Sequence, residues 1–251
     1  MVLPMSSVPD VADDDSWSVP APRPRTTVDD VQTTLKNMIH RGELGPGDRL
    51  PPERQLCAKL QVSRSSLREA LNALRADGYV EVRRGATGGT FITRLDEPYS
   101  RWLAWLRADS SRLRDIINVR TAVECQIAWL AAENQTAEDL QRLSATLSGG
   151  VEALTPREFR EMDGRFHATL AELAGSARLT SLMIEGRGEL FVPASSPLID
   201  RQTMLRSQVQ HEAILVAVRD GRPVDAVEAM RHHLQSTYVD VAFAIDGPDF
   251  K

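Results

Sequence analysis

Residues 52–76, PERQLCAKLQVSRSSLREALNALRA, contain two short helical patterns joined by a tight turn. The first helix is expected over residues 52–60, where two consecutive prolines favour a helix start. The second is expected over residues 64–76, with Ser63 before it as the N-cap and leucines at helical spacing along one face. Two helices arranged in this way are typical of a helix-turn-helix.

The flanking sequence extends this motif to a winged helix-turn-helix. Upstream, apolar residues at helical spacing predict a helix over residues 28–40. Downstream, the strands of a hairpin are expected over residues 79–82 and 90–93. The loop between them, residues 83–89, is basic and rich in glycine. Three helices followed by a hairpin with a basic tip describe this DNA-binding fold.

The second helix of such a motif enters the major groove, where its N-terminal side chains reach base edges. Arginine bonds guanine in a bidentate way, and serine hydroxyls suit phosphates or bases. A single arginine would be interpreted as a solvated surface charge, but several on the expected elements favour DNA contact. The residues assigned to DNA are Arg64, Ser65, Ser66 and Arg68 on this helix, Arg54 on the preceding helix, and Arg83 and Arg84 at the wing.

Charge is distributed unevenly along the chain. Residues 23–95 carry 13 Lys and Arg against 8 Asp and Glu, a net charge of +5. Because the whole chain has a net charge of −5, the remaining residues carry −10. This asymmetry is expected of a DNA-binding module joined to a different domain, although chance clustering would also produce it.

The rest of the chain is predicted to be all α-helical, which makes the fold class mainly α. We expect a disordered tail over residues 1–25, a winged helix-turn-helix over residues 26–95 and a helical bundle over residues 96–251. The expected bundle helices cover residues 99–107, 111–133, 136–147, 156–174, 177–190, 200–219 and 223–244.

Cellular location follows from what the sequence lacks. No apolar run approaches the roughly 20 residues that cross a bilayer, and the N-terminus lacks the pattern of a secretory signal. With two cysteines, the sequence does not indicate a disulfide framework. We therefore expect a cytoplasmic protein associated with the nucleoid.

Four residues of the C-terminal half have the chemistry of metal ligands. Asp163 and His167 are four residues apart and share a helix face. His211 lies ten residues before Gly221, at the break between the last two helices, and His233 lies twelve after it. Both therefore stand roughly 15–18 Å from the turn and level with each other in an antiparallel pair.

Three imidazoles and a carboxylate suit Zn²⁺, Ni²⁺ or a similar transition metal, with open positions for a ligand. The alternative is that each histidine is an ordinary core or surface residue. The neighbouring His232 falls on a polar face and is left outside the set. Arg120 and Arg187 are candidate partners for a carboxylate effector, with structural ion pairs as the alternative.

The N-terminal part closely resembles the GntR family. The resemblance rests on three stretches: Gly42–Leu56, Val62–Leu71, and Gly78 with the Tyr-Val that follows. It implies that Arg54, Arg64 and Arg68 contact operator DNA and that Gly85 at the wing tip approaches the minor groove. Pro52 departs from the Ser found in many members, which removes a side-chain cap and leaves the arginines in place.

The C-terminal half resembles the FCD ligand-binding domain of the FadR subfamily. Its matching stretches are Val119–Glu124, Ala131–Glu133, Asp163–Gly175, His211–Leu215 and Ala229–Leu234. The resemblance implies that Asp163, His167, His211 and His233 hold a metal that helps to bind a small carboxylate. Two departures are Ser176, where Asn is common, and residues 191–197, which are rich in Pro and Ser.

These features lead to one expected function and two alternatives. We expect a homodimeric regulator, more often a repressor in this family, that binds a palindromic operator and responds to a small organic acid. A metalloenzyme is the first alternative, because such a site could activate water. The second is a DNA-binding protein whose metal is purely structural.

Overall fold

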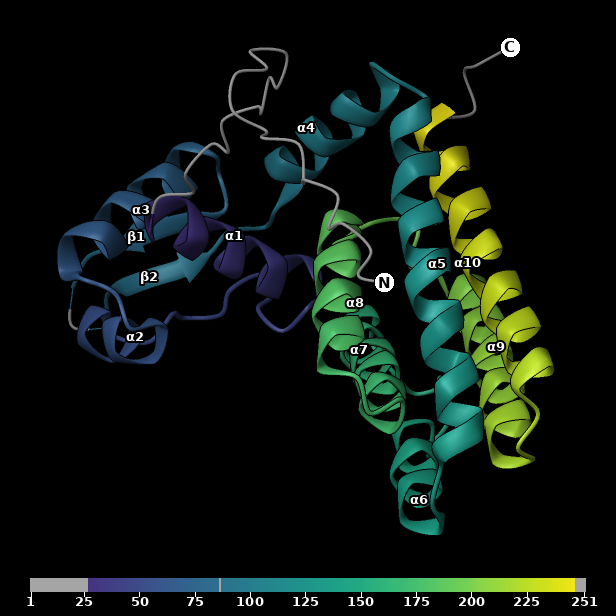
Figure 1. The fold of residues 1–251 in the computed structure, drawn as a ribbon. Helices are drawn as coiled ribbons and strands as arrows, with labels where there is room; N and C mark the ends of the chain where they lie inside the picture. The colour runs from purple at the N-terminus through teal and green to yellow at the C-terminus, as the bar shows by residue number, and fades with distance from the viewer. Residues whose placement is uncertain (1–26, 86, 247–251) are drawn as a thin grey trace, which may run out of the picture.

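The computed structural model describes residues 27–85 and 87–246 of the 251 residues. These residues form ten helices and one two-stranded sheet, which confirms the mainly α fold (Figure 1). The helices are α1 (Thr27–His40), α2 (Glu53–Leu60), α3 (Arg64–Ala76), α4 (Asp96–Arg107), α5 (Ser111–Asn134), α6 (Ala137–Thr146), α7 (Pro156–Leu173), α8 (Ala177–Glu189), α9 (Arg201–Arg219) and α10 (Pro223–Asp246). The strands are β1 (Val80–Arg83) and β2 (Gly89–Ile92). The tail predicted over residues 1–25 lies outside the described residues.

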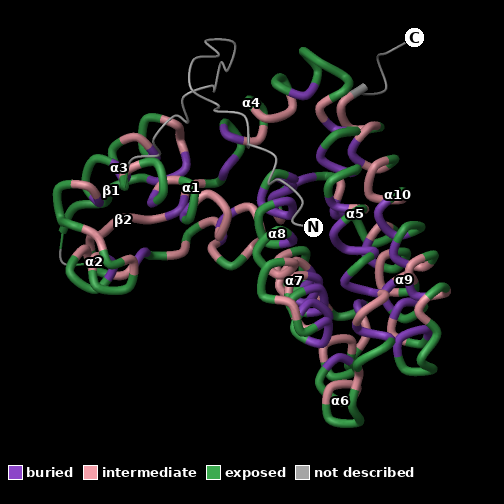
Figure 2. Tube along the Cα trace, in the orientation of Figure 1, coloured by how far each residue is buried: buried purple, intermediate pink, exposed green. Residues whose placement is uncertain are grey.

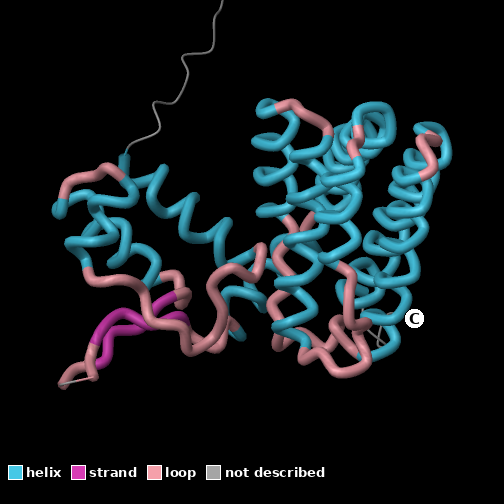
Figure 3. The backbone as a smooth tube through the Cα atoms, turned by 90° about the horizontal axis from the view of Figure 1, so that it is seen from below, coloured by secondary structure: helices cyan, strands magenta, loops and turns pink. Residues whose placement is uncertain are grey.

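The N-terminal unit is a three-helix cluster with a hairpin. α3 begins where the sequence predicts, because the Ser63 hydroxyl accepts a hydrogen bond from the Ser66 amide. The preceding Gln61 adopts a left-handed conformation (φ 55°), which turns the chain sharply between α2 and α3. The strands pair antiparallel and lie one residue from their predicted positions. In Figure 3 the hairpin tip points away from the helical bundle.

The C-terminal unit is a helical bundle in which α10 packs against α5 and α9. Its largest fully buried side chains include Phe166, Leu170 and Ile214, which come from α7 and α9. Figure 2 shows the buried stretches on the inward faces of the long helices. α7 starts at a complete capping box, in which the Thr155 and Glu158 side chains bond each other's backbone amides.

The junction between the two units is an aromatic cluster. Phe191 follows α8, yet it is fully buried in the core of the N-terminal unit. Its ring stacks on His40 at the end of α1, with centroids 4.1 Å apart. His40 also donates from Nδ1 to the Gly188 carbonyl oxygen at 2.6 Å. Tyr99 and Trp102 of α4 contact the Phe191 ring edge-on. The loop after α8 therefore anchors the bundle to α1.

A second contact between the units is electrostatic. The Arg157 guanidinium of α7 donates two hydrogen bonds to the Asp48 carboxylate, at 2.9 and 2.7 Å. Bidentate pairs of this kind fix orientation as well as distance. Within the described residues, the structure contains no helix that is long and apolar enough to span a membrane.

Candidate metal centre, ligand pocket and DNA-binding face

The four predicted metal ligands come together in the core of the bundle. Asp163 and His167 lie on α7, His211 on α9 and His233 on α10, and all four are buried. One ligand atom from each residue lies within 4.8 Å of the others. The Asp163 Oδ1 atom lies 3.5 Å from His211 Nε2 and 3.8 Å from His167 Nε2. The spacing of these groups suits a shared central ion.

Two partners orient the imidazoles from outside the group. His167 Nδ1 lies 2.7 Å from Glu124 Oε2, and His233 Nδ1 donates to Gln210 Oε1 at 3.0 Å. In each ring these contacts occupy Nδ1 and leave Nε2 for a metal, as is usual for metal-bound histidine. Sequence reasoning missed Glu124 and Gln210, although Glu124 stands four residues after Arg120 and Gln210 precedes His211.

The donor set fits a metal because three of its ring nitrogens are buried without a hydrogen-bond partner in the described part of the chain. Among the described residues, His167 Nε2 and both ring nitrogens of His211 are buried without a hydrogen bond. Leaving such polar atoms unpaired in a protein interior costs free energy. A transition-metal ion would bind the lone pair of His167 Nε2 and that of one His211 nitrogen, and three imidazoles with one carboxylate match the preferences of Zn²⁺ and Ni²⁺.

The ionisation states of these groups also suit metal ligation. Burial lowers the pKa of His211 to about 3 and holds the pKa values of His167 and His233 below their usual range. Burial alone would raise the pKa of Asp163, but the Arg187 charge holds it well below its usual range. Neutral imidazoles and an ionised carboxylate are the forms that bind metals.

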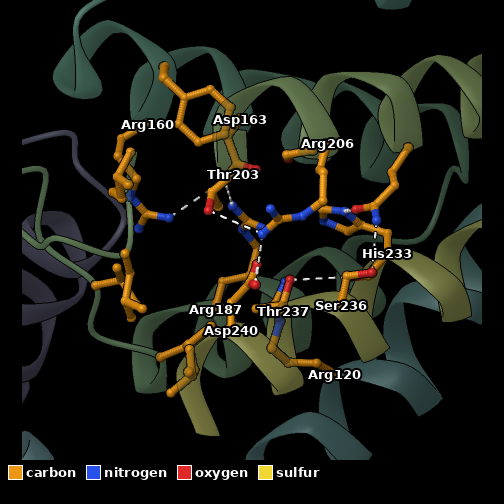
Figure 4. Close-up of a pocket in the computed structure, with 18 of the residues that line it drawn as sticks. Arg120, Arg160, Asp163, Arg187, Thr203, Arg206, His233, Ser236, Thr237 and Asp240 are labelled. Atoms are coloured by element: carbon orange, nitrogen blue, oxygen red, sulfur yellow. Dashed lines mark hydrogen bonds and ion pairs between the residues drawn. The ribbon is translucent and has the colours of Figure 1, made fainter. Parts of the chain in front are cut away.

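A pocket of about 90 Å³ adjoins the four residues (Figure 4). Asp163 and His233 belong to its wall, so an ion held there would face the pocket. Arg120 and Arg187, predicted to bind an effector, also line it and are buried. Each already bonds a carboxylate: Arg187 donates to Asp163 at 2.5 Å and Arg120 to Glu124 at 2.7 Å. Their remaining N–H groups are the donors available to a ligand.

Three more arginines line the pocket, and sequence reasoning missed them. Arg160 lies on α7, Arg206 lies on α9, and Arg41 follows α1 of the N-terminal unit. Arg206 pairs with Asp240 at 2.8 Å on the more exposed side. Arg160 precedes Asp163 by three residues, a helical spacing that places both on one face. The contribution of Arg41 could not be predicted because it depends on how the two units pack.

Part of the pocket lining is apolar. Its side chains come from the first turn of α7, the loop after α8 and the last turns of α10, and they are Phe159, Leu190, Val192, Leu198, Ile199 and Val241. Residues 191–197, whose Pro and Ser content departs from the FCD pattern, contribute Val192 to this lining. Leu190 and Val192 face the pocket while Phe191 between them is buried in the N-terminal core.

The predicted DNA-contact residues form an exposed face on the N-terminal unit. Arg64, Arg68 and Arg54 are all exposed on α3 and α2. The Arg68 guanidinium is held by Glu53, with Nε donating to Oε2 at 2.8 Å. This pair keeps Arg68 beside the start of α2 and leaves its terminal N–H groups exposed. Ser65 and Ser66 hydroxyls both lie within 2.9 Å of Ser63 Oγ, so they are part of the α3 cap.

The wing residues differ in how they are held. Arg83 bonds Glu81 and covers the Phe91 ring at 4.4 Å from its centroid, so its side chain is fixed against the hairpin. Arg84 and Gly85 are exposed at the tip. Gly85 has a φ of +110°, which favours glycine, and a Cβ there would meet no atom within 4 Å. The tip therefore presents backbone to an approaching surface.

Comparisons with known families match both parts of the chain. Residues 27–92 match the family described as bacterial regulatory proteins, gntR family, and residues 115–236 match the FCD domain.

Several curated relatives align with most of the chain. The HTH-type transcriptional regulator LutR of Bacillus subtilis is 35% identical, over 78% of this chain and 93% of LutR. The HTH-type transcriptional repressor NanR of Klebsiella aerogenes is 32% identical, over 82% of each chain. A protein of Escherichia coli K12 whose name links it to the L-lactate dehydrogenase operon is 36% identical, over 84% of each chain.

A solved structure shares the fold. The E. coli protein McbR/YncC aligns with a TM-score of 0.52 at 15% identity, covering 87% of this chain and 98% of its own.

Proposed function

Because the chain belongs to the GntR family of bacterial regulatory proteins and carries an FCD domain, we propose that a small organic acid controls its affinity for DNA. The chain is a DNA-binding transcriptional regulator and not an enzyme. In this proposal residues 26–95 bind the operator and residues 96–251 bind the effector. The observation that carries the proposal is that Asp163 and His233, two of four clustered residues that could hold a metal, lie in the wall of an arginine-lined pocket.

The metal centre would be formed by Asp163, His167, His211 and His233, with Zn²⁺ or Ni²⁺ as the ion. A bound divalent ion would supply positive charge and open coordination positions for a carboxylate oxygen. The chain's own part is to keep the imidazoles neutral and oriented and to keep Asp163 ionised. Arg120 and Arg187 would donate their remaining N–H groups to the same carboxylate.

Control of DNA binding requires that the acid favours one placement of the N-terminal unit over another. The junction supports such coupling because residues adjacent in sequence contact the pocket on one side and the N-terminal unit on the other. Leu190 and Val192 line the pocket, whereas Phe191 packs in the core of the N-terminal unit. Arg187 holds the metal ligand Asp163, and the next residue, Gly188, accepts a hydrogen bond from His40 of α1. A shift in the loop after α8 would therefore move α1.

The mode of regulation is proposed from the relatives and from symmetry. NanR is named a repressor, and the E. coli K12 relative is linked by name to an L-lactate dehydrogenase operon, which agrees with an organic acid as effector. We propose repression that the acid relieves. A homodimer would place two α3 helices on the half-sites of a palindromic operator. Its site of action would be the cytoplasm, on nucleoid DNA.

Two adjacent histidines provide a test of the metal centre. Replacing His233 by Ala is expected to weaken Zn²⁺ binding by more than about 100-fold, because loss of even an outer partner of a metal ligand costs roughly 10- to 100-fold. His232→Ala is the matched control, since His232 is exposed. Competition with a chromophoric chelator and elemental analysis of the purified protein measure the effect.

The same variants have different expected thermal stabilities. Zn²⁺ at 100 times its Kd is expected to stabilise the wild type and His232→Ala by about 2.7 kcal/mol, which raises Tm by roughly 5–10 °C. His233→Ala should show no such rise. Equal Zn²⁺ affinity in the two variants would show that these four residues do not form the metal centre.

A further inference from the structure

Arg160 is a nearly buried cation that lacks a carboxylate of its own. Its side chain is 14% exposed, and Nη1 lies 3.7 Å from Asp163 Oδ2, beyond hydrogen-bonding distance. That oxygen already accepts from Arg187 at 2.5 Å. The strong bond of Arg160 is to a neutral group: Nη2 donates to the His40 carbonyl oxygen at 2.7 Å. Buried charges are normally paired, so Arg160 is a place where an anion would be favoured.

The charge around the pocket points the same way. Five arginines line the pocket, and the carboxylates that line it or bond these arginines are Asp163, Asp240, Glu43 and Glu124. This set therefore carries one net positive charge, and a divalent ion would raise it to three. One carboxylate would leave two positive charges in a partly enclosed site, where uncompensated charge is costly.

Arg160 approaches the metal ligand Asp163, with Nη1 3.7 Å from Oδ2, but it lies away from His233. In Figure 4, Arg160 lies on the opposite side of the pocket from His233, whose ring belongs to the metal centre. Leu190, Val192 and the other apolar side chains named above line the same pocket and form its apolar wall. A short aliphatic chain packs on such a wall and carries one charged group to each end.

We propose, as an extension of the proposed function, that the effector is a short dicarboxylate. One carboxylate binds at the metal centre with Arg120 and Arg187, and the other forms an ion pair with Arg160. Arg160 is then the residue that determines specificity for a second anionic group. Arg41 also lines the pocket, and it follows His40, whose carbonyl oxygen accepts the hydrogen bond from Arg160.

This placement has a consequence for the junction. His40 is the last residue of α1, and the carbonyl groups at a helix C-terminus carry partial negative charge. The second carboxylate competes with the His40 carbonyl for Arg160 and repels the end of α1. A dicarboxylate therefore weakens a contact between the two units that a monocarboxylate, bound only at the metal end, leaves in place.

Pairs of acids with equal carbon number test the proposal. Isothermal titration of the Zn²⁺-loaded full-length protein is to compare malonate with propionate, succinate with butyrate, and glutarate with valerate. The best dicarboxylate is expected to bind at least about tenfold more tightly than its monocarboxylate partner, as one charge-assisted pair would produce. Arg160→Gln is expected to weaken dicarboxylate binding at least about tenfold more than monocarboxylate binding and so to remove this preference. Arg165→Gln, an exposed change on the same helix, keeps it.

Equal affinity for both members of every pair in the wild type overturns the proposal, as does an equal loss for both in Arg160→Gln. The wild-type comparison decides the question even if Arg160→Gln fails to fold, and Arg160→Lys, which keeps the charge, should retain most of the preference. If no acid binds to the metal-loaded protein, the proposed function itself fails. If acids bind but dicarboxylates are not preferred to monocarboxylates, only the dicarboxylate proposal is contradicted.

Discussion

Replacing Arg64 and Arg68 together by Ala is expected to abolish specific operator binding while the protein stays folded. Each arginine that bonds a guanine contributes about 1–3 kcal/mol of discrimination, or roughly 5- to 150-fold in affinity. Both side chains are exposed on α3, so their removal opens no cavity. Fluorescence anisotropy measures the loss, using a duplex that the wild-type protein selects from a random pool.

A matched change separates base contacts from loss of charge. Arg178→Ala removes an exposed arginine from α8, outside the proposed DNA-binding residues, and should leave operator affinity within about twofold. If the double variant binds the selected duplex as tightly as Arg178→Ala does, α3 is not the helix that contacts the bases. Unchanged far-UV circular dichroism is the check that both variants are folded.

Phe191→Ala is expected to damage both stability and communication between the two units. Truncating a fully buried Phe costs about 3–5 kcal/mol, and this ring fills the space between His40, Tyr99 and Trp102. A loss of that size lowers Tm by roughly 6–20 °C in a protein of this size. Since Phe191 lies between two pocket residues, acid binding should persist while its effect on operator affinity decreases.

An exposed phenylalanine provides the comparison. Phe243 on α10 is 69% exposed, and Phe243→Ala should change stability by no more than about 0.5 kcal/mol. Phe191→Leu, which keeps most of the apolar volume, should recover much of the stability and of the acid response. A Phe191→Ala protein with wild-type Tm and a full operator response to the acid would show that the junction does not carry the coupling.

Local signals in the sequence predicted most of the secondary structure. Ser63 caps α3 as expected, and α3 spans the predicted residues because the leucine spacing and the cap agree. The strands were shifted by one residue, since the pattern gives no cross-strand register and the pairing of Val80 with Ile92 sets it. The prediction placed the start of α4 three residues late, at residue 99 rather than Asp96.

The candidate site was predictable to the extent that it depends on helical phase. Asp163 and His167 share a face by their spacing, and the short turn at Gly221 makes His211 and His233 level in an antiparallel pair. The same reasoning separated His233 from the exposed His232. These relations are local or cross a single tight turn, so they do not depend on how distant segments pack.

The remainder of the site depends on contacts between distant segments. His40 and Gly188 are 148 residues apart in sequence, and no periodicity relates them. Arg120 and Arg187 were predicted as ligand donors, but the structure shows that each also holds a buried carboxylate. The position of Phe191 in the N-terminal core follows from packing between the two units, which a helical or strand pattern does not encode.

Operator affinity, measured by anisotropy with and without a saturating acid, tests the central claim most directly. The Zn²⁺-loaded wild type is expected to lose at least about fivefold in affinity for its selected duplex, the lower end of typical coupling between sites. The His233→Ala protein should show no change with the acid. If Zn²⁺ raises the Tm of the wild type but no acid changes its operator affinity, the metal is structural and the proposed control is wrong.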